Sequence, residues 1–210
     1  MKIKWHGEES VSIKTSNVKV VFGLYEHNNK LTVVIDKDSL LILPYKLITY
    51  SHFIQEKVNK SGCFLIDGAG EYSYKSATII VKSIKRLDNL KTNIVSMSIN
   101  NMLIVYLGSL DRELDGEDIG FVGNPDILFI PVGGSGVLNS NKANSLVNSI
   151  EPRVVVPMNY QYEDFSVEKN PIDGFANEYG FKKDFASEYA VKKSELPYDT
   201  TEVKLLSVEI

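Results

Sequence analysis

The sequence predicts a layered α/β protein in which helices lie outside packed sheets. Two observations predict this fold class. The first hundred residues consist mainly of short apolar or alternating segments bounded by turn signals, which is the pattern of a strand meander. After residue 110, continuous apolar runs alternate with segments of helical periodicity, which is the pattern of β-α-β units.

The first half of the chain supplies most of the expected strands. Polar turn signals separate them, such as residues 26–30 and the Asn100-Asn101 pair. The predicted strands are residues 11–14, 18–22, 31–35, 63–66, 77–84, 92–99 and 102–107.

The second half predicts strands at 126–130 and 154–156, each a continuous apolar run. Between them, Asn139-Ser140 begins a helix whose apolar residues are Ala143, Leu146, Val147 and Ile150. Asn170-Pro171 opens a second helix that ends at Gly180, and residues 202–210 close the chain as a strand. Because no linker divides the chain, we expect a single domain spanning 1–210.

Composition excludes several classes of partner. The net charge of −4 gives no general attraction to nucleic acid or anionic membranes. The apolar runs are too short to span a bilayer, and no apolar stretch of a secretory signal follows the N-terminus. We therefore expect a cytoplasmic protein that binds neither nucleic acid nor membrane.

Nitrogen and sulfur ligands for a transition metal are scarce. The chain has three histidines and one cysteine, so a rich two-metal site is not expected.

Several segments together resemble the small-hydrolase branch of the metallo-β-lactamase superfamily. They are Trp5-His6-Gly7, Gly68-Ala69-Gly70-Glu71-Tyr72, residues 105–110, residues 126–134, residues 151–160 and residues 192–197. The resemblance covers nearly the whole chain. It implies an αββα four-layer sandwich with a site at one edge, and in that family zinc ions held by histidines and carboxylates perform hydrolysis.

The family's metal ligands are replaced in this sequence. Aligned with the His-x-His-x-Asp-His loop, the chain has Tyr50, His52, Ile54 and Gln55, so that only His52 keeps its type. The bridging aspartate corresponds to Ser109 and the final histidine to Asn159. Another ligand histidine maps near Leu87. The resemblance therefore implies a vestigial pocket formed by Tyr50, His52, Gln55, Ser109 and Asn159, with no metal and no cofactor.

The favoured hypothesis is a metal-free, catalytically inactive relative that acts as a binding or assembly module for an unknown small molecule or protein partner. The alternative is a hydrolase of ester or phosphodiester bonds that uses a residual or displaced site around His52. Such an enzyme would work either without a metal or with a displaced metal held by His52 and carboxylates such as Asp36, Asp38 or Asp67. A hydrolase with the family's usual metal site would require a different alignment. Self-association into a homo-oligomer is also expected from the resemblance and from exposed strand edges.

Overall fold

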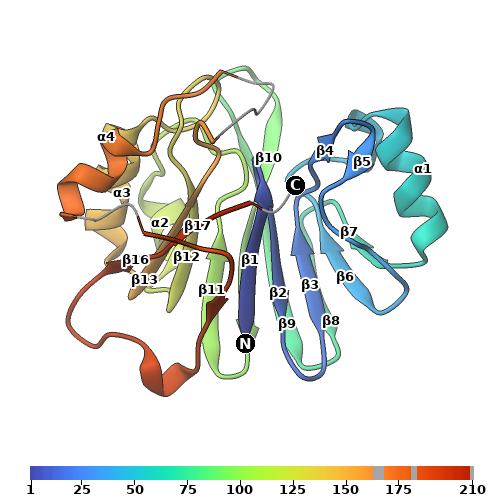
Figure 1. Ribbon diagram of the computed structural model, residues 1–210, viewed down its shortest axis with the longest axis horizontal. Coiled ribbons are helices and arrows are strands. Elements are labelled where there is room, and N and C mark those ends of the chain that lie inside the picture. Colours follow the sequence, from blue (N-terminus) through green and yellow to red (C-terminus); the bar gives the residue numbers. More distant parts are fainter. Residues whose placement is uncertain (163–167, 181–183, 209–210) are drawn as a thin grey trace.

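The computed structural model describes residues 1–162, 168–180 and 184–208. Two mixed sheets form its centre (Figure 1). The strands of the first sheet are β1 (Lys2–Gly7), β2 (Ser10–Lys14), β3 (Lys19–Phe22), β6 (Ser39–Ile42), β7 (Phe64–Ile66) and β15 (Tyr189–Ala190). They are ordered β15-β1-β2-β3-β6-β7.

The second sheet is ordered β16-β13-β12-β11-β10-β9-β8. Its strands are β8 (Gly70–Tyr74), β9 (Ala77–Lys85), β10 (Lys91–Ile99), β11 (Met102–Tyr106), β12 (Ile127–Pro131), β13 (Val154–Met158) and β16 (Glu202–Val203). Two short pairs complete the strands: β4 (Glu26–His27) with β5 (Lys30–Leu31), and β14 (Phe185–Ala186) with β17 (Leu205–Leu206).

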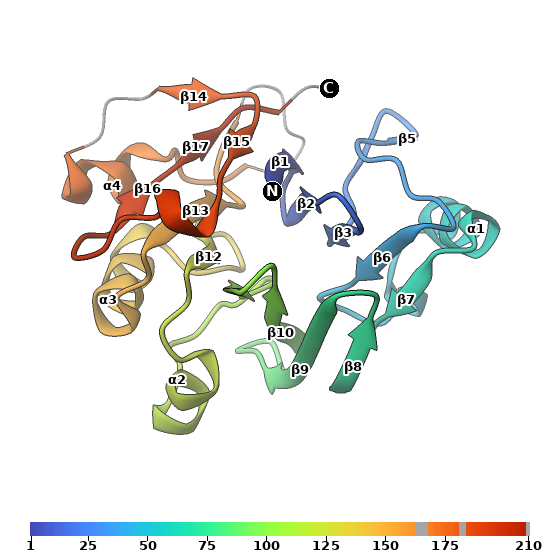
Figure 2. The same ribbon diagram turned by 90° about the horizontal axis from the view of Figure 1, so that it is seen from below.

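Helices cover the outer faces of the two sheets. They are α1 (His52–Ser61), α2 (Gly116–Val122), α3 (Ser140–Ile150) and α4 (Asp173–Ala176), with 3-10 turns η1 (Leu47–Thr49), η2 (Asn177–Tyr179) and η3 (Lys193–Glu195). Figure 2 shows α1 outside the first sheet and α2 and α3 outside the second. The predicted α/β sandwich is confirmed. Among the described residues, no helix has both the length and the apolar character needed to cross a membrane.

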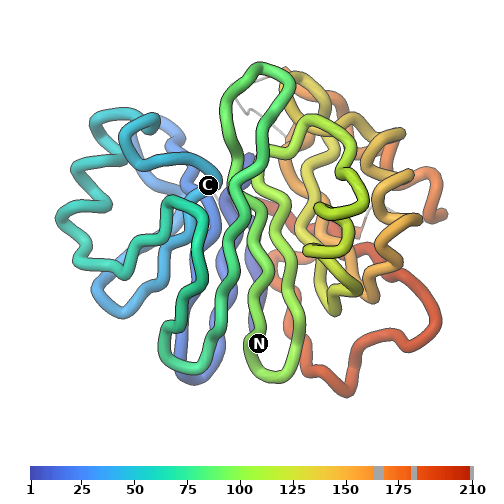
Figure 3. Tube along the Cα trace, turned by 180° about the vertical axis from the view of Figure 1, so that it is seen from behind, coloured from blue at the N-terminus to red at the C-terminus, as the bar shows by residue number. Residues whose placement is uncertain are grey.

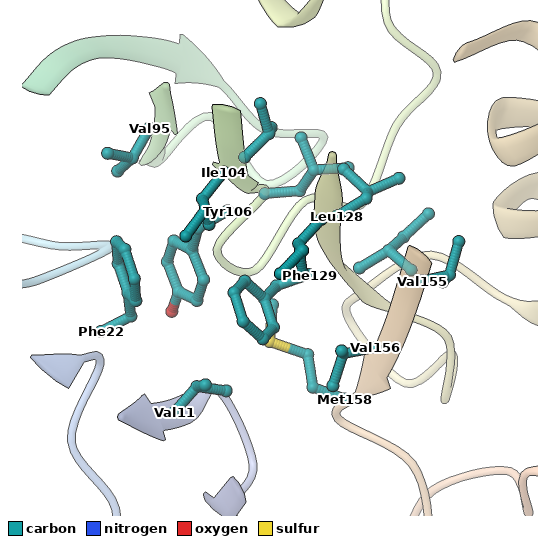
Figure 4. Close-up of a cluster of buried hydrophobic side chains, with 14 of the residues drawn as sticks. Val11, Phe22, Val95, Ile104, Tyr106, Leu128, Phe129, Val155, Val156 and Met158 are labelled. Atoms are coloured by element: carbon teal, nitrogen blue, oxygen red, sulfur yellow. The ribbon is translucent and has the colours of Figure 1, made fainter. Parts of the chain in front are cut away.

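The core lies between the two sheets, because the strands turn apolar side chains toward one another. Phe22 on β3 stacks on Tyr106 of β11 with ring centroids 4.8 Å apart, and it lies 6.1 Å from Phe129 of β12. All three side chains are fully buried (Figure 4). This contact holds the first sheet against the second.

Several elements differ from the sequence expectations. The predicted strand at 31–35 contributes only Leu31 to β5, and Val33 packs instead in a second apolar cluster with Ile54 and Val58. Those two residues are the buried ones of α1, a helix that we did not expect, because a stripe of two apolar residues gives little helical periodicity. The predicted strand at 202–210 is two short strands, β16 and β17; residues 209–210 lie outside the described residues.

Candidate active site

Five connections meet at one edge of the sandwich. They are the β1–β2 turn, the loop after β6, the β9–β10 hairpin, the turn after β11 and the end of β13. Two backbone hydrogen bonds join connections of opposite sheets: Asn159 N–H donates to the Glu8 carbonyl (3.2 Å), and Asn93 N–H donates to the Pro44 carbonyl (2.8 Å). Figure 3 shows the β9–β10 hairpin, in green, at the end of the molecule away from the N-terminus.

Glu9, in the β1–β2 turn, is the titratable group at the centre of this edge. Burial raises the pKa of its carboxyl to about 7, and the Glu8 carboxylate adds to the rise, while Lys169 and Arg86 oppose it. Gly23 leaves the space that Glu9 uses, because a Cβ at Gly23 would lie 2.7 Å from both Glu9 Cγ and the Glu9 carbonyl oxygen. The residue is half-buried, so part of it remains accessible to water.

Three tyrosines surround Glu9. Tyr106 Oη donates a hydrogen bond to the Glu9 carbonyl oxygen (3.1 Å), and the rings of Tyr45 and Tyr50 lie 6.4 Å apart. Burial and the nearby Glu9 charge raise the pKa of Tyr45 to about 12 and hold the pKa values of Tyr50 and Tyr106 well above the usual value. All three hydroxyls therefore stay protonated at neutral pH. Tyr50 Oη is buried and has no hydrogen-bond partner among the described residues.

Arg86 supplies a fixed positive charge at the same edge. Its Nη1 donates to Tyr45 Oη and its Nη2 donates to the Gly136 carbonyl (2.9 Å). Asp88 lies 3.1 Å and Asp111 3.5 Å from guanidinium nitrogens. Asp111 also accepts from Leu87 N–H, which anchors the carboxylate that orients Arg86.

A second charged pair lies beside the end of β13. Glu8 and Lys169 form an ion pair of 3.3 Å in which both side chains are almost fully buried. Glu8 Oε1 and Asn159 Oδ1 are buried acceptors with no partner among the described residues. The Glu8 carbonyl accepts from Trp5 Nε1 (2.9 Å), and the indole packs on Tyr160 with centroids 4.7 Å apart.

The structure brings some of the sequence-predicted residues to this edge and leaves others outside it. Tyr50 lies at this edge. Ser109 is buried and forms a hydrogen bond with Tyr45, and Asn159 is buried beside Glu8. His52 and Gln55 belong to α1: His52 is exposed, and Gln55 Nε2 donates to the Tyr50 carbonyl (2.8 Å).

Sequence reasoning missed Glu9, Tyr45 and Arg86. The strand before the ligand loop ends at Ile42, so the loop already begins at Leu43 and includes Tyr45; our alignment began it at Tyr50. Arg86 directly precedes Leu87, where we placed a missing histidine. The adjacent acidic pair Glu8-Glu9 between two strands was the available signal for the carboxyl.

The described residues do not fit a metal centre. They contain no group of three or more His, Cys, Asp and Glu side chains that could hold a metal ion. Donors at the edge are mainly tyrosine hydroxyls, and the positive charge of the nearby Arg86 guanidinium disfavours a second cation beside Glu9. Of the carboxylates considered for a displaced metal, Asp67 is instead paired with Lys46 (3.1 Å), and Asp36 and Asp38 are exposed.

Comparison with known proteins identifies the family. Residues 2–159 match the model of the beta-lactamase superfamily domain. The chain belongs to the metallo-β-lactamase superfamily. A putative Zn-dependent hydrolase of this superfamily from Thermotoga maritima has the same fold, with a TM-score of 0.77 and 16% identity over 98% of this chain and 99% of that one.

Two further proteins are similar to this chain in sequence. A UPF0173 metal-dependent hydrolase of Staphylococcus aureus is 23% identical over 199 residues, covering 76% of this metallo-β-lactamase superfamily member and 86% of the relative. A UPF0173 protein of Pyrococcus abyssi is also 23% identical, over 184 residues that cover 76% of this chain and 83% of the relative.

These names correct two sequence predictions. The Staphylococcus aureus relative of this superfamily member is named a metal-dependent hydrolase and the Thermotoga maritima protein a putative Zn-dependent hydrolase, so the prediction of a catalytically inactive binding or assembly module is wrong. The prediction that no cofactor is used is wrong for the same reason, since the family points to a metal. The residue changes behind both predictions are real, but replacement of familiar ligands does not establish loss of catalysis.

Proposed function

We propose that this protein is a hydrolase of ester or phosphodiester bonds, and that its reaction centre is displaced from the family's ligand loop to Glu9. The observation that carries this proposal is the Glu9 carboxyl itself, whose pKa of about 7 suits a group that takes and returns a proton at neutral pH. The hydrolase names of the relatives support the reaction class.

The surrounding groups define the roles in the proposed reaction. Ionised Glu9 accepts a proton from a water molecule as the water oxygen bonds to the ester carbon or to phosphorus. Negative charge then develops on the substrate oxygen, and Tyr50 Oη, a buried donor without a partner among the described residues, is available to stabilise it. When the bond to the leaving group breaks, protonated Glu9 returns the proton to the departing oxygen.

Arg86 acts in this scheme through its charge and its orientation. Because Asp88, Asp111 and Tyr45 hold the guanidinium in place, it need not reorganise as negative charge develops nearby. The relatives' names point to a metal in the family, but the described residues do not fit one, so no step of this scheme runs through a metal. Elemental analysis of the purified protein should accompany every assay.

Glu9→Gln tests the proposal. With p-nitrophenyl acetate and bis(p-nitrophenyl) phosphate as substrates, wild-type activity should rise with pH through about 7, because the base must be ionised. The variant should lose about 10²- to 10⁴-fold in kcat/KM. His52→Ala is the matched control and should retain activity, because His52 is exposed.

Two results would contradict this assignment. Full activity in Glu9→Gln would remove Glu9 from the reaction. Loss of activity in His52→Ala alone would favour the alternative centre around His52. A cytoplasmic location and lack of nucleic-acid binding belong to the same proposal, and the net charge of −4 supports the latter.

A further inference from the structure

A cavity of about 460 Å³ opens beside Tyr45 and Arg86. It lies between the loop after β6 and the β9–β10 hairpin, and it has the size of a small-molecule site. Its lining residues are Pro44, Tyr45, Lys46, Thr49, Asp67, Ser83, Arg86, Asp88, Leu90, Lys91 and Asn93. Tyr45 and Arg86 thus belong both to the cavity wall and to the surroundings of Glu9.

Exposed apolar side chains belong to both loops that form the cavity. Leu90, in the wall, is 62% exposed, and Leu87 in the same hairpin is 68% exposed. Ile48, between lining residues of the opposite loop, is 77% exposed. Because Leu90 places a large exposed apolar side chain in the cavity wall, the cavity can contact an apolar group of a ligand.

The charges of the cavity leave one cation without a partner. Lys46 is paired with Asp67 (3.1 Å), and Arg86 is paired with both Asp88 (3.1 Å) and Asp111 (3.5 Å), so each of these cations already has a carboxylate partner. Lys91, which follows Leu90, is exposed and forms no ion pair with a described residue. A ligand with a single negative charge would complement this arrangement, whereas a cation would meet Lys91 unfavourably.

The cavity walls are held in place independently of any ligand. Asp67 accepts from Leu47 N–H (3.0 Å) and fixes η1. Asn93 Nδ2 donates to the Leu43 carbonyl (2.9 Å), and its backbone N–H donates to Pro44, which ties β10 to the loop after β6. The site is therefore preformed, and binding does not require the two loops to be ordered first.

We propose that this cavity binds the apolar, singly anionic part of an amphipathic substrate, and that Leu90 and Lys91 select it. The inference rests on the proposed function, because it treats the cavity as the substrate subsite next to Glu9. The apolar body lies against Leu90 and its neighbours, the anionic group faces Lys91, and the bond to be hydrolysed extends past Tyr45 and Arg86 toward Glu9.

Binding of octanoate and of octylammonium, followed by calorimetry, tests the subsite. These probes have the same apolar chain and opposite charge. The wild-type protein should bind octanoate more tightly than octylammonium. Lys91→Glu should weaken octanoate binding by about threefold to tenfold and reverse the preference, while Leu90→Ser should weaken binding of both probes by about tenfold.

Matched surface variants control for nonspecific effects. Lys37→Glu makes the same charge change and Val34→Ser a similar apolar-to-polar change, both at exposed positions outside this cavity. Both should bind octanoate as the wild type does. Equal binding of the two probes, or octanoate binding that is indifferent to Lys91→Glu and Leu90→Ser, overturns the proposal.

Glu9→Gln separates the subsite from the reaction. Octanoate binding that survives Glu9→Gln and still depends on Lys91 and Leu90 supports the subsite, even if hydrolysis also survives and the proposed reaction centre fails. Loss of hydrolysis in Glu9→Gln together with octanoate binding that ignores Lys91 and Leu90 overturns the subsite alone.

Discussion

Glu9 shares its surroundings with three tyrosine hydroxyls that remain neutral at physiological pH. A neutral hydroxyl stabilises a nearby carboxylate less than a cation does, so burial dominates and the proton stays on Glu9 to a higher pH than in water. The Arg86 guanidinium opposes this rise, but its charge is shared with Asp88 and Asp111. Glu9 is therefore populated in both its protonated and its ionised form near neutral pH.

This balance predicts a pH dependence of stability. The folded protein binds the Glu9 proton up to about pH 7, whereas the unfolded chain releases it near the ordinary glutamate pKa of 4.5. Between those values the folded state holds more protons, so stability relative to Glu9→Gln should fall as pH rises, by a total on the order of 1–3 kcal/mol. Denaturant unfolding of the wild type and of Glu9→Gln from pH 4 to 8 measures this difference in stability. A constant difference between them would show that the Glu9 carboxyl titrates normally.

Among the elements, the turn after β12 depends on close approach to the end of β13. A Cβ at Gly133 would lie 1.9 Å from the Asn159 carbonyl oxygen and 2.8 Å from Tyr160 Cα, both backbone atoms that cannot move aside cheaply. This contact sets the position of Asn159 and, through its N–H, of the Glu8 carbonyl. The β1–β2 turn is thus positioned by a glycine in a distant element.

Gly133→Ala should destabilise the protein by about 1–3 kcal/mol because the strand end must shift. Gly120→Ala is the matched control: it lies in α2, a Cβ there meets nothing within 4 Å, and alanine favours helix. Thermal or urea unfolding compares the two. Equal stability of Gly133→Ala and the wild type would mean that the edge can relax without cost.

The elements also show how far the sequence could predict the site. The buried strands of the second half, β12 and β13, and helix α3 follow from continuous apolar runs and helical periodicity, and all three are found. The loop after β6 was misplaced because Leu43 and Pro44 continue the apolar run of the strand, so no local signal marks the strand end at Ile42. The site residues Glu9, Tyr45 and Arg86 are far apart in sequence, and only tertiary structure brings their charges together.

At the scale of the molecule, Asp126 connects the second sheet to the C-terminal segment. It accepts hydrogen bonds from Leu103 N–H (2.9 Å), Arg153 (3.0 Å) and Lys193. Burial opposes its ionisation, but these donors hold the pKa of Asp126 below its usual value. Its contribution to stability is therefore present above the unfolded-state pKa and is lost as pH falls through the lower folded-state pKa.

Asp126→Asn should lower the free energy of unfolding by about 1–3 kcal/mol at neutral pH, because Arg153 and Lys193, which are partly exposed, lose their buried counter-charge. This loss of stability should become smaller at acidic pH. Glu56→Gln, which breaks the exposed pair with Lys60, is the control and should change stability little. A loss in Asp126→Asn no larger than in this control would mean that Arg153 and Lys193 find other partners.

The single-domain span of 1–210 and homo-oligomer formation stay predictions. One hydrophobic cluster includes residues as distant as Ile3 and Val208, which is what a single domain requires. Size-exclusion chromatography with light scattering measures the oligomeric state.

The contact between Trp5 and the Glu8 carbonyl has a practical consequence. Trp5 is the one tryptophan of the chain, and its buried indole is wedged between the β1–β2 turn and Tyr160. Its fluorescence emission therefore comes from a single position next to the proposed reaction centre. Any event that loosens this turn changes the polarity around the indole, so the native protein contains its own optical reporter of the edge and needs no attached dye.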